Sequence, residues 1–257
     1  MILFHRHYGE GPPLVILHGL FGQCDNWVTV GRKLGENHLS VFCMDLRNHG
    51  LSPRDATFTL SAMAADVAET LDDLRIPSVH LLGHSMGGKV AMEFARTYPE
   101  KLKSLILADI GPGYYPPHHQ QIISGLKAVK PEEISSRQEA EERLAGYIAD
   151  HGTRQFLLKN LYRNDSGNNF AWRFNLAVIA GQIEEIGKAL PECTIDVPSL
   201  FYHGGNSNYI TPASYHAIMQ QFISAEFRVM QGAGHWLHAE QPDAFTDTVS
   251  AWVKRFA

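Results

Sequence analysis

A serine in a glycine-rich turn is the residue of this sequence best suited to covalent chemistry. Residues 79–92 read VHLLGHSMGGKVAM, which is an apolar run, a G-x-S-x-G turn centred on Ser85, and a helical pattern that continues to Tyr98. Small residues on both sides allow a sharp strand-to-helix turn that exposes the serine hydroxyl. The helix N-terminus also favours negative charge that develops near Ser85. The segment therefore predicts a serine nucleophile.

Two histidines near the C-terminus are candidates for the base, because a serine hydroxyl attacks a carbonyl only when an imidazole accepts its proton. Residues 230–240 read MQGAGHWLHAE; His235 directly follows the last expected strand, and His238 lies one helical turn later. His84, next to the nucleophile, is expected to pack along the turn. We expect one of the two C-terminal histidines to approach Ser85.

The third member of such a site is a carboxylate that accepts the imidazole N–H and stabilises the imidazolium. Residues 201–210, FYHGGNSNYI, follow a late strand but contain no Asp or Glu. Asp109 instead ends an apolar run, at the sheet edge where sites in parallel sheets assemble. Asp165 and Asp196 fit less well, because the first falls in an expected lid and the second precedes its strand. Asp109 is the predicted acid, although a lone Asp here could also cap a loop.

The elements expected to position these residues are repeated βα units. Continuous apolar runs are typical of strands buried on both faces of a parallel sheet, and they occur at residues 14–17, 41–44, 79–82, 105–108, 200–202 and 227–230. Residues 60–74 have the 3.6-residue period of an amphipathic helix.

The alternation of strands and helices stops between about Tyr114 and Leu190. A Pro-rich entry leads into helix-like segments that include residues 131–149 and 154–162, and we expect no buried strand among them. The sequence thus predicts a core of residues 1–113 and 191–257, with residues 114–190 inserted as a helical lid.

The nucleophile turn, in its strand and helix context, resembles that of the α/β-hydrolase superfamily from about residue 14 to the C-terminus. The fold implied is a mostly parallel sheet flanked by helices. A second motif, HGLFG at residues 18–22, corresponds to the H-G-x-x-G turn that places a backbone N–H opposite the nucleophile. The resemblance implies an oxyanion hole formed by the N–H groups of Leu20 and Met86. It also favours His235 as the base, which leaves His238 as a surface or substrate-facing residue. The order Ser85, Asp109, His235 is also that of the superfamily.

Five motifs narrow the resemblance to small bacterial esterases of the YbfF type and the related ABHD11-like hydrolases: HGLFG, DLRNHGLSPR, GHSMGGK, GGNS and GAGHWLHAE. In that group the acid corresponds to Asp109, and a serine that assists the triad corresponds to Ser207. The shared turn at residues 45–50 is interpreted as structural.

Composition excludes several other classes. The 22 basic and 27 acidic residues give a net charge of −5, which disfavours a general nucleic-acid-binding surface. No run approaches the length of a membrane span and no signal peptide is visible, so a cytoplasmic location is expected. The three cysteines and 14 histidines lack metal-ligand spacing. We expect neither a metal nor an organic cofactor.

The predicted function is a carboxylesterase that cleaves short to medium acyl esters through an acyl-enzyme on Ser85. An acyl-CoA thioesterase is the first alternative, because Arg154, Lys159, Arg163 and Arg173 in the lid could meet an anionic leaving group, although a solvated basic face is the simpler interpretation. Phe156, Leu157, Leu158, Phe170, Trp172 and Phe174 could line an acyl pocket or form the core of the lid. A ligand-binding protein on a hydrolase scaffold is the alternative from another class. The sequence does not indicate an oligomeric state.

Overall fold

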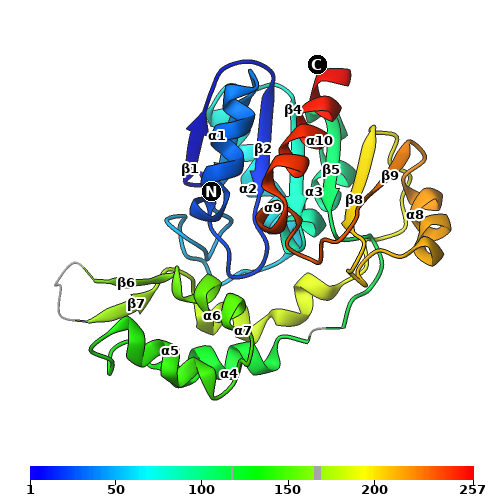
Figure 1. The fold of residues 1–257 in the computed structure, drawn as a ribbon. Coiled ribbons are helices and arrows are strands. Elements are labelled where there is room, and N and C mark those ends of the chain that lie inside the picture. Colours follow the sequence, from blue (N-terminus) through cyan, green and yellow to red (C-terminus); the bar gives the residue numbers. More distant parts are fainter. Residues whose placement is uncertain (117, 165–168) are drawn as a thin grey trace.

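A seven-stranded sheet with helices on both faces is the centre of the molecule (Figure 1). The computed structural model describes residues 1–116, 118–164 and 169–257. The strand order is β1-β3-β2-β4-β5-β8-β9, and every pairing is parallel except that of β1 with β3. The strands are β1 (His5–Tyr8), β2 (Pro13–Leu17), β3 (Ser40–Met44), β4 (Val79–His84), β5 (Leu102–Ala108), β8 (Ser199–Gly204) and β9 (Ala225–Met230). The α/β-hydrolase fold expected from the sequence is confirmed.

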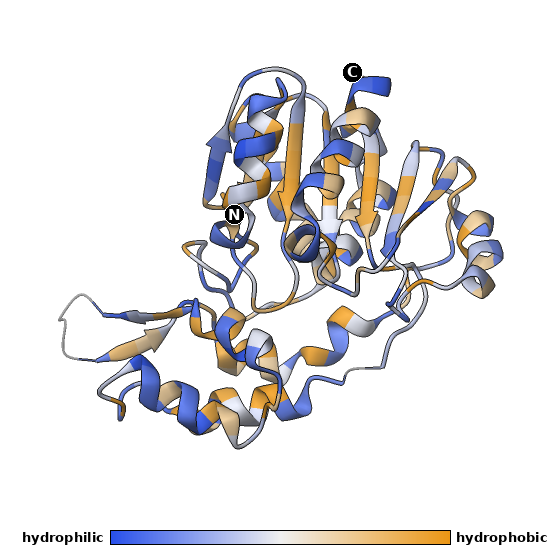
Figure 2. Ribbon diagram, in the orientation of Figure 1, coloured by the Kyte–Doolittle hydropathy of each residue, from blue (hydrophilic) through white to orange (hydrophobic). Residues whose placement is uncertain are grey.

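Alternate residues of the central strands face two separate hydrophobic cores. Leu14 and Ile16 of β2 pack in the core that also contains Val249 and Trp252 of α10 (Pro242–Arg255). Val15 and Leu17 belong to the core on the other side. Because both faces of the strand are covered, an uninterrupted apolar run is required, and Figure 2 shows these strands as the most hydrophobic part of the ribbon.

The helices of the core follow the expected pattern. They are α1 (Val28–Glu36), α2 (Leu60–Asp73), α3 (Met86–Thr97), α8 (Tyr215–Gln221), α9 (Leu237–Glu240) and α10. Helix α2 matches the helix expected at residues 60–74, and the Thr59 side chain caps it by accepting a hydrogen bond from the Ala62 N–H. Among the described residues, no helix is both long enough and apolar enough to cross a membrane.

Strand β1 is absent from the sequence-based expectation. Its residues, HRHY, are intermediate or exposed, because β1 lies at the edge of the sheet and pairs only with β3. An edge strand with little burial has no apolar run from which it could be recognised. The missing signal therefore reflects its position in the sheet.

The chain between β5 and β8 forms a separate layer beside the carboxyl ends of the strands (Figure 1). This layer contains α4 (Gln120–Val129), α5 (Arg137–Ala145), α6 (His151–Leu158), α7 (Leu176–Gly181) and an antiparallel hairpin of β6 (Leu161–Arg163) and β7 (Phe170–Trp172). The expectation that no strand interrupts these helices was wrong. The helix expected at 154–162 ends at Leu158, because residues 161–163 pair with β7 instead. The helical pattern of residues 154–162 gave no sign of this pairing.

A buried lysine of α3 forms hydrogen bonds to both segments that connect the core with this layer. The Lys89 ammonium donates hydrogen bonds to the carbonyl oxygens of Pro112 and Gly113, where the chain leaves the core, and of Lys188, where it returns. Lys89 is only 2% exposed. The two connections are thus held together one helical turn after Ser85.

Candidate active site

Ser85 occupies a strained turn between β4 and α3. Its backbone has φ 53° and ψ −118°, a conformation that residues with a side chain rarely adopt. The Ser85 carbonyl accepts hydrogen bonds from the N–H groups of Gly88 and Lys89, and the Ser85 N–H donates to Ala108 O of β5. The turn is held from both sides, and the side chain reaches a cavity.

Two glycines of the G-x-S-x-G motif are required by close backbone packing. A Cβ atom at Gly83 would lie 2.2 Å from the Gly87 carbonyl oxygen, and one at Gly87 would lie 2.3 Å from the Leu17 carbonyl oxygen. Neither obstacle is a flexible side chain. The motif therefore reflects the approach of β2, β4 and α3 around the serine.

Asp109 follows β5 directly and is fully buried. One carboxylate oxygen, Oδ2, accepts hydrogen bonds from His235 Nδ1 at 2.6 Å and from Ser207 Oγ at 2.5 Å. The other, Oδ1, accepts one from the Gly204 N–H at 3.2 Å. The loop that lacks an acid thus supplies two donors to the acid of the neighbouring strand.

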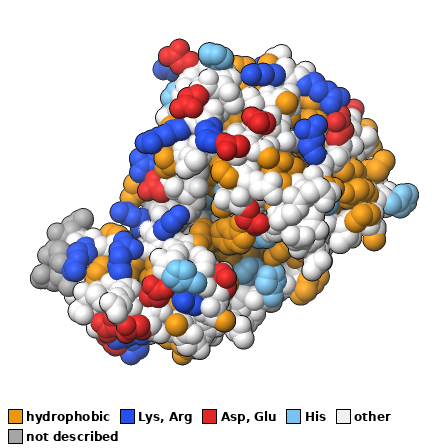
Figure 3. Space-filling view, in the orientation of Figure 1, with side chains coloured by type: hydrophobic (Ala, Val, Ile, Leu, Met, Phe, Trp, Pro, Cys, Tyr) orange, Lys and Arg blue, Asp and Glu red, His pale blue; other side chains and the backbone are white. Residues whose placement is uncertain are grey.

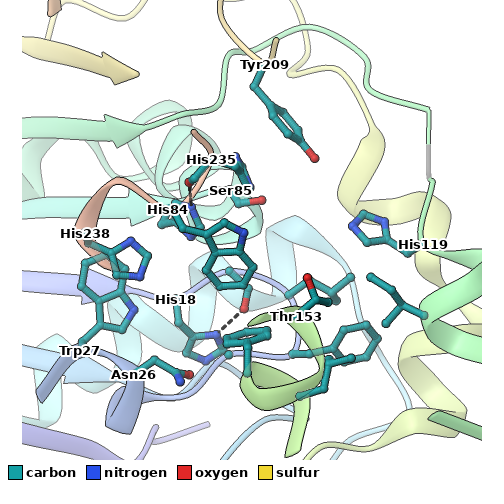
Figure 4. A pocket seen from close by; sticks show the side chains of 18 of the residues that line it. His18, Asn26, Trp27, His84, Ser85, His119, Thr153, Tyr209, His235 and His238 are labelled. Atoms are coloured by element: carbon teal, nitrogen blue, oxygen red, sulfur yellow. Dashed lines mark hydrogen bonds between the residues drawn. The ribbon is translucent and has the colours of Figure 1, made fainter. Parts of the chain in front are cut away.

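His235 is held at one edge of its ring, on one face of the ring, and through its backbone carbonyl. Its Nδ1 donates to Asp109, the Tyr209 ring stacks on it with centroids 4.2 Å apart, and its carbonyl accepts a hydrogen bond from His84 Nε2 at 2.8 Å. Figure 4 shows Ser85 and His235 next to each other at the same cavity. With Nδ1 engaged, Nε2 is the ring nitrogen left to serve the serine.

The other two histidines have different surroundings. Burial, followed by the neighbouring His235 and His238, lowers the pKa of His84 well below its usual value, so His84 stays neutral and packs along the turn as expected. His238 is 6% exposed, stacks on Trp27 with centroids 4.0 Å apart, and borders the cavity. Burial lowers the pKa of His238 to about 3. The surface position considered for it was wrong; the position facing the cavity agrees with the structure.

Leu20 lines the same cavity as Ser85, and Met86 follows Ser85 in the chain. Met86 is the first residue of α3, where N–H groups have no acceptor within the helix. Leu20 belongs to a tight turn in which the Gly22 N–H donates to Gly19 O at 2.9 Å and Phe21 has φ 58°. The position of these residues is compatible with an oxyanion hole, which stays a prediction.

The turn at residues 45–50 supports this region from the core. His49 Nε2 accepts a hydrogen bond from the Phe21 N–H at 3.3 Å, and the Asp45 carboxylate accepts from the N–H groups of Cys24 and Leu51. Burial lowers the pKa of His49 to about 3, which keeps Nε2 free to accept. These contacts agree with the structural interpretation of the turn.

The cavity at Ser85 has a volume of about 190 Å³ and lies between the core and the β5–β8 layer. Figure 3 shows a hollow lined by hydrophobic side chains between these two parts. Leu20, Trp27 and Trp236 line it from the core, whereas Ile122 of α4 and Phe156 of α6 line it from the other layer. The cavity walls therefore suit an acyl chain.

The aromatic and basic residues expected in the lid divide into two groups. Phe156 and Leu157 line the cavity. Phe170, Trp172 and Phe174 are buried; the rings of Trp172 and Phe174 stack 5.2 Å apart, and Phe174 also packs on Phe21 of the core, with ring centroids 4.9 Å apart. The basic side chains contribute mainly to the layer itself: Arg154 donates to the carbonyl oxygens of Ile148 and Ala149, Arg163 lies over Phe170, and Arg173 lies over Tyr162.

Comparison with known proteins agrees with the fold and the motifs. A family model described as alpha/beta hydrolase fold matches residues 12–125. Esterase YbfF of Escherichia coli (strain K12) is 37% identical over 242 residues, which cover 94% of this chain and 92% of that protein. The chain belongs to the α/β-hydrolase family.

Other relatives of this hydrolase cover it almost completely. The sn-1-specific diacylglycerol lipase ABHD11 of Xenopus laevis is 38% identical over 253 residues, which cover 95% of this chain and 80% of that protein. A solved structure named Marine microorganism esterase matches the hydrolase with a TM-score of 0.94 and 38% identity, over 100% of both chains. The resemblance stated from the five motifs is confirmed.

Several residues of the hydrolase site were not foreseen as site residues. Tyr209, Thr153 and His119 line the cavity around Ser85 (Figure 4). Burial, with a contribution from the Asp109 charge, raises the pKa of Tyr209 to about 12. No motif marks Thr153, but Tyr209 lies two residues after Ser207 in the same loop, which was a usable signal. Asp165 falls outside the described residues, and Asp196 accepts a hydrogen bond from Ser224.

Proposed function

We propose that this hydrolase is a serine carboxylesterase in which Ser85 is the nucleophile, His235 the base and Asp109 the acid. The observation that carries the proposal is the fully buried Asp109 carboxylate, bonded to His235 at 2.6 Å beside the cavity that Ser85 reaches. Relatives named esterase, at 37% and 38% identity over almost the whole chain, support the reaction class.

Acylation begins when His235 accepts the Ser85 proton and the serine oxygen attacks the ester carbonyl. The tetrahedral oxyanion lies at the N–H groups of Leu20 and Met86, each of which contributes on the order of 10²- to 10³-fold in rate. The imidazolium formed at His235 is stabilised by Asp109, which stays ionised. His235 then protonates the departing alcohol, leaving an acyl group on Ser85.

Deacylation repeats these steps with water. His235 accepts a proton from water, the resulting hydroxide attacks the acyl-enzyme, and the carboxylic acid leaves as Ser85 recovers its proton. Ser207 is an auxiliary residue whose hydroxyl donates to Asp109 throughout the cycle. In this scheme, protons and electron pairs move only among these side chains, the substrate and water.

The substrate proposed is a small ester with a short to medium acyl chain. The support is the apolar lining of the cavity, to which both the core and the β5–β8 layer contribute. Because residues from both parts line this cavity, we propose that residues 114–190 form a lid over it, inserted between core parts 1–113 and 191–257. An acyl-CoA thioester is the second candidate, but three of the four basic lid residues are engaged within the lid.

Labelling with a fluorophosphonate tests the nucleophile. One adduct per chain, located on Ser85 by mass spectrometry and lost in Ser85→Ala, is the expected result. Absence of an adduct on the folded protein would contradict the proposal. Rates on p-nitrophenyl esters of graded length, compared with matching acyl-CoA thioesters, then separate the two substrate classes; the esters should be favoured by at least about tenfold, or roughly 1.4 kcal/mol in barrier.

A further inference from the structure

Asn160, in the lid, forms a direct bond to the turn that contains Leu20. It lies between α6 and β6 and is fully buried. Its side-chain Nδ2 donates to the carbonyl oxygen of Phe21 at 2.8 Å and, less closely, to that of Leu157 at 3.3 Å. Phe21 is 139 residues away in the sequence. The bond therefore joins the lid to the core at the residue after Leu20.

Phe21 is the residue of this turn whose backbone most needs support. Its φ of 58° lies in the left-handed region, which is unfavourable for a residue with a Cβ and persists only where the surroundings hold it. The Phe21 N–H is held by His49 of the core, and the Phe21 carbonyl is held by Asn160 of the lid. Each side of this residue is thus fixed by a different part of the molecule.

The direction of the Leu20 N–H depends on the same turn. The Gly22 N–H donates to Gly19 O, so residues 19–22 form one closed unit that contains Leu20 and Phe21. If Phe21 relaxes toward an ordinary conformation, the peptide units on its N-terminal side rotate with it. An oxyanion donor must face the position that the charged oxygen will occupy, and small rotations weaken it.

The donor end of the Asn160 carboxamide provides this contact. Nδ2 makes both side-chain hydrogen bonds, whereas Oδ1 is buried and has no partner within the described part of the chain. A second lid residue adds to the contact, because Gln23 Nε2 of the core donates to the Lys159 carbonyl at 3.3 Å. The arrangement explains why an amide, and not simply a side chain of that volume, occupies position 160.

We propose that Asn160 is a positioning residue for the oxyanion hole, so that catalysis by the core requires the lid to be in place. The inference rests on the proposed function, since it assumes that the Leu20 N–H stabilises an oxyanion formed at Ser85. Asn160 does not line the cavity. Its effect on the reaction therefore passes through the Phe21 carbonyl and the turn.

Two variants test the donor. Asn160→Ala should lower kcat by about 10- to 100-fold, less than or equal to the 10²- to 10³-fold loss expected when an oxyanion donor is removed altogether, while KM changes by less than about threefold. Asn160→Asp keeps the volume but replaces the donor by a carboxyl group. Burial raises the pKa of such a group, and its protonated form can donate again. The kcat of Asn160→Asp relative to wild type should therefore recover as the pH falls from 9 to 6.

A matched pair of variants controls for a general loosening of the lid. Gln182 is another lid carboxamide that bridges to the core; it donates to Ala56 O and accepts from the Phe58 N–H, and neither partner belongs to the turn at residues 19–22. Gln182→Ala and Gln182→Glu should leave kcat within about threefold of wild type. Thermal unfolding of all four variants shows whether they are folded at the assay temperature. If Asn160→Ala is not folded, Asn160→Asp is used to test the inference.

A tetrahedral inhibitor gives the readout that a purely structural role would not affect. A trifluoromethyl ketone adds to Ser85 and places an oxyanion in the hole, so its inhibition constant should rise in the Asn160 variants by the factor by which kcat falls. Binding of the carboxylic acid product should stay unchanged. Wild-type kcat in Asn160→Ala, or equal losses in the Gln182 variants, would overturn the inference. Hydrolysis that survives in Ser85→Ala would instead overturn the proposed function.

Discussion

Replacing Asp109 by Asn is the most informative single substitution in the proposed site. Asn has nearly the same volume, and it tolerates the left-handed backbone that Asp109 adopts at φ 52°. Alanine would add backbone strain to the loss of the charge. Asp109→Asn therefore changes the chemistry of the site with little change of its shape.

The expected loss follows from the contact with His235. At an effective dielectric constant of about 20, an imidazolium and a carboxylate 2.6 Å apart attract each other by about 6 kcal/mol. That attraction exists only once His235 has accepted the serine proton, so it acts mainly on the transition state. At 1.36 kcal/mol per tenfold, its removal corresponds to a decrease in kcat of about 10⁴-fold, which is also the size of the loss that the same Asp→Asn change causes in a serine protease triad.

Ser207→Ala provides the internal comparison. The variant removes one of the three hydrogen bonds that Asp109 accepts and leaves those from His235 and Gly204. A hydrogen bond to a charged group is worth about 1.5–3 kcal/mol. Because the Ser207 bond is present in both the ground state and the transition state, only part of this energy affects kcat. We expect a loss of about tenfold.

The assay is kcat for a saturating p-nitrophenyl ester near pH 8, with urea unfolding to show that each variant is folded. A loss below about tenfold in Asp109→Asn would refute the role given to this carboxylate. A loss in Ser207→Ala as large as that in Asp109→Asn would show that the hydroxyl, and not the charge, is the essential partner of His235.

Four further substitutions test the packing and the charges around the site. Gly87→Ala places a Cβ against the Leu17 carbonyl, so the free energy of unfolding in urea should fall by more than about 2 kcal/mol; an unchanged midpoint would show that the turn can shift. Asp66→Asn deprives the buried Arg47 of its buried carboxylate partner and should lower that free energy by about 3–5 kcal/mol. Asp55→Asn, at the exposed partner of Arg47, should leave it nearly unchanged. Burial lowers the pKa of Lys89 to about 7, from about 10.4 in the unfolded chain. Between about pH 7 and 10.4, Lys89 is therefore protonated in the unfolded chain but mostly neutral in the folded one. The free energy of unfolding of wild type relative to Lys89→Met should then rise with pH, by at most about 1.4 kcal/mol per pH unit. A difference that stays flat between pH 7 and 9 would contradict this.

The sheet could be predicted from the sequence where its strands are buried on both faces. Each of the six runs lies within a strand of the structure. Five of them are buried on both faces, which requires continuous hydrophobicity. The sixth lies in β9 at the edge of the sheet, where Arg228 and Val229 are exposed. Strand β1 and the hairpin of β6 and β7 were not predicted. Strand β1 pairs with a distant segment, β3, whereas β6 and β7 pair with each other but have only three residues each, so neither case leaves a local pattern long enough to recognise.

The candidate site likewise has parts that could be predicted from the sequence and parts that could not. The turn around Ser85 is encoded in consecutive residues, since the glycines that permit it, Gly83 and Gly87, lie two residues before and after the serine. The choice of Asp109 required a comparison of two strand ends, and the structure brings Asp109 next to His235. The loop position of Tyr209 pointed to the site, but the stacking of its ring on His235 and the burial of His238 against Trp27 depended on the tertiary structure.

The sequence by itself determined the nucleophile turn, the doubly buried strands and the family, because each depends on residues adjacent in the chain or on motifs that can be matched one by one. Only the tertiary structure decided how the loop at residues 204–209 supports an acid that it does not contain, and that an amide of the β5–β8 layer, that of Asn160, reaches the turn next to Leu20. Those contacts join segments about 95–139 residues apart. They depend on the placement of β5 beside β8 and of α6 against the core, which follows from the packing of the whole chain.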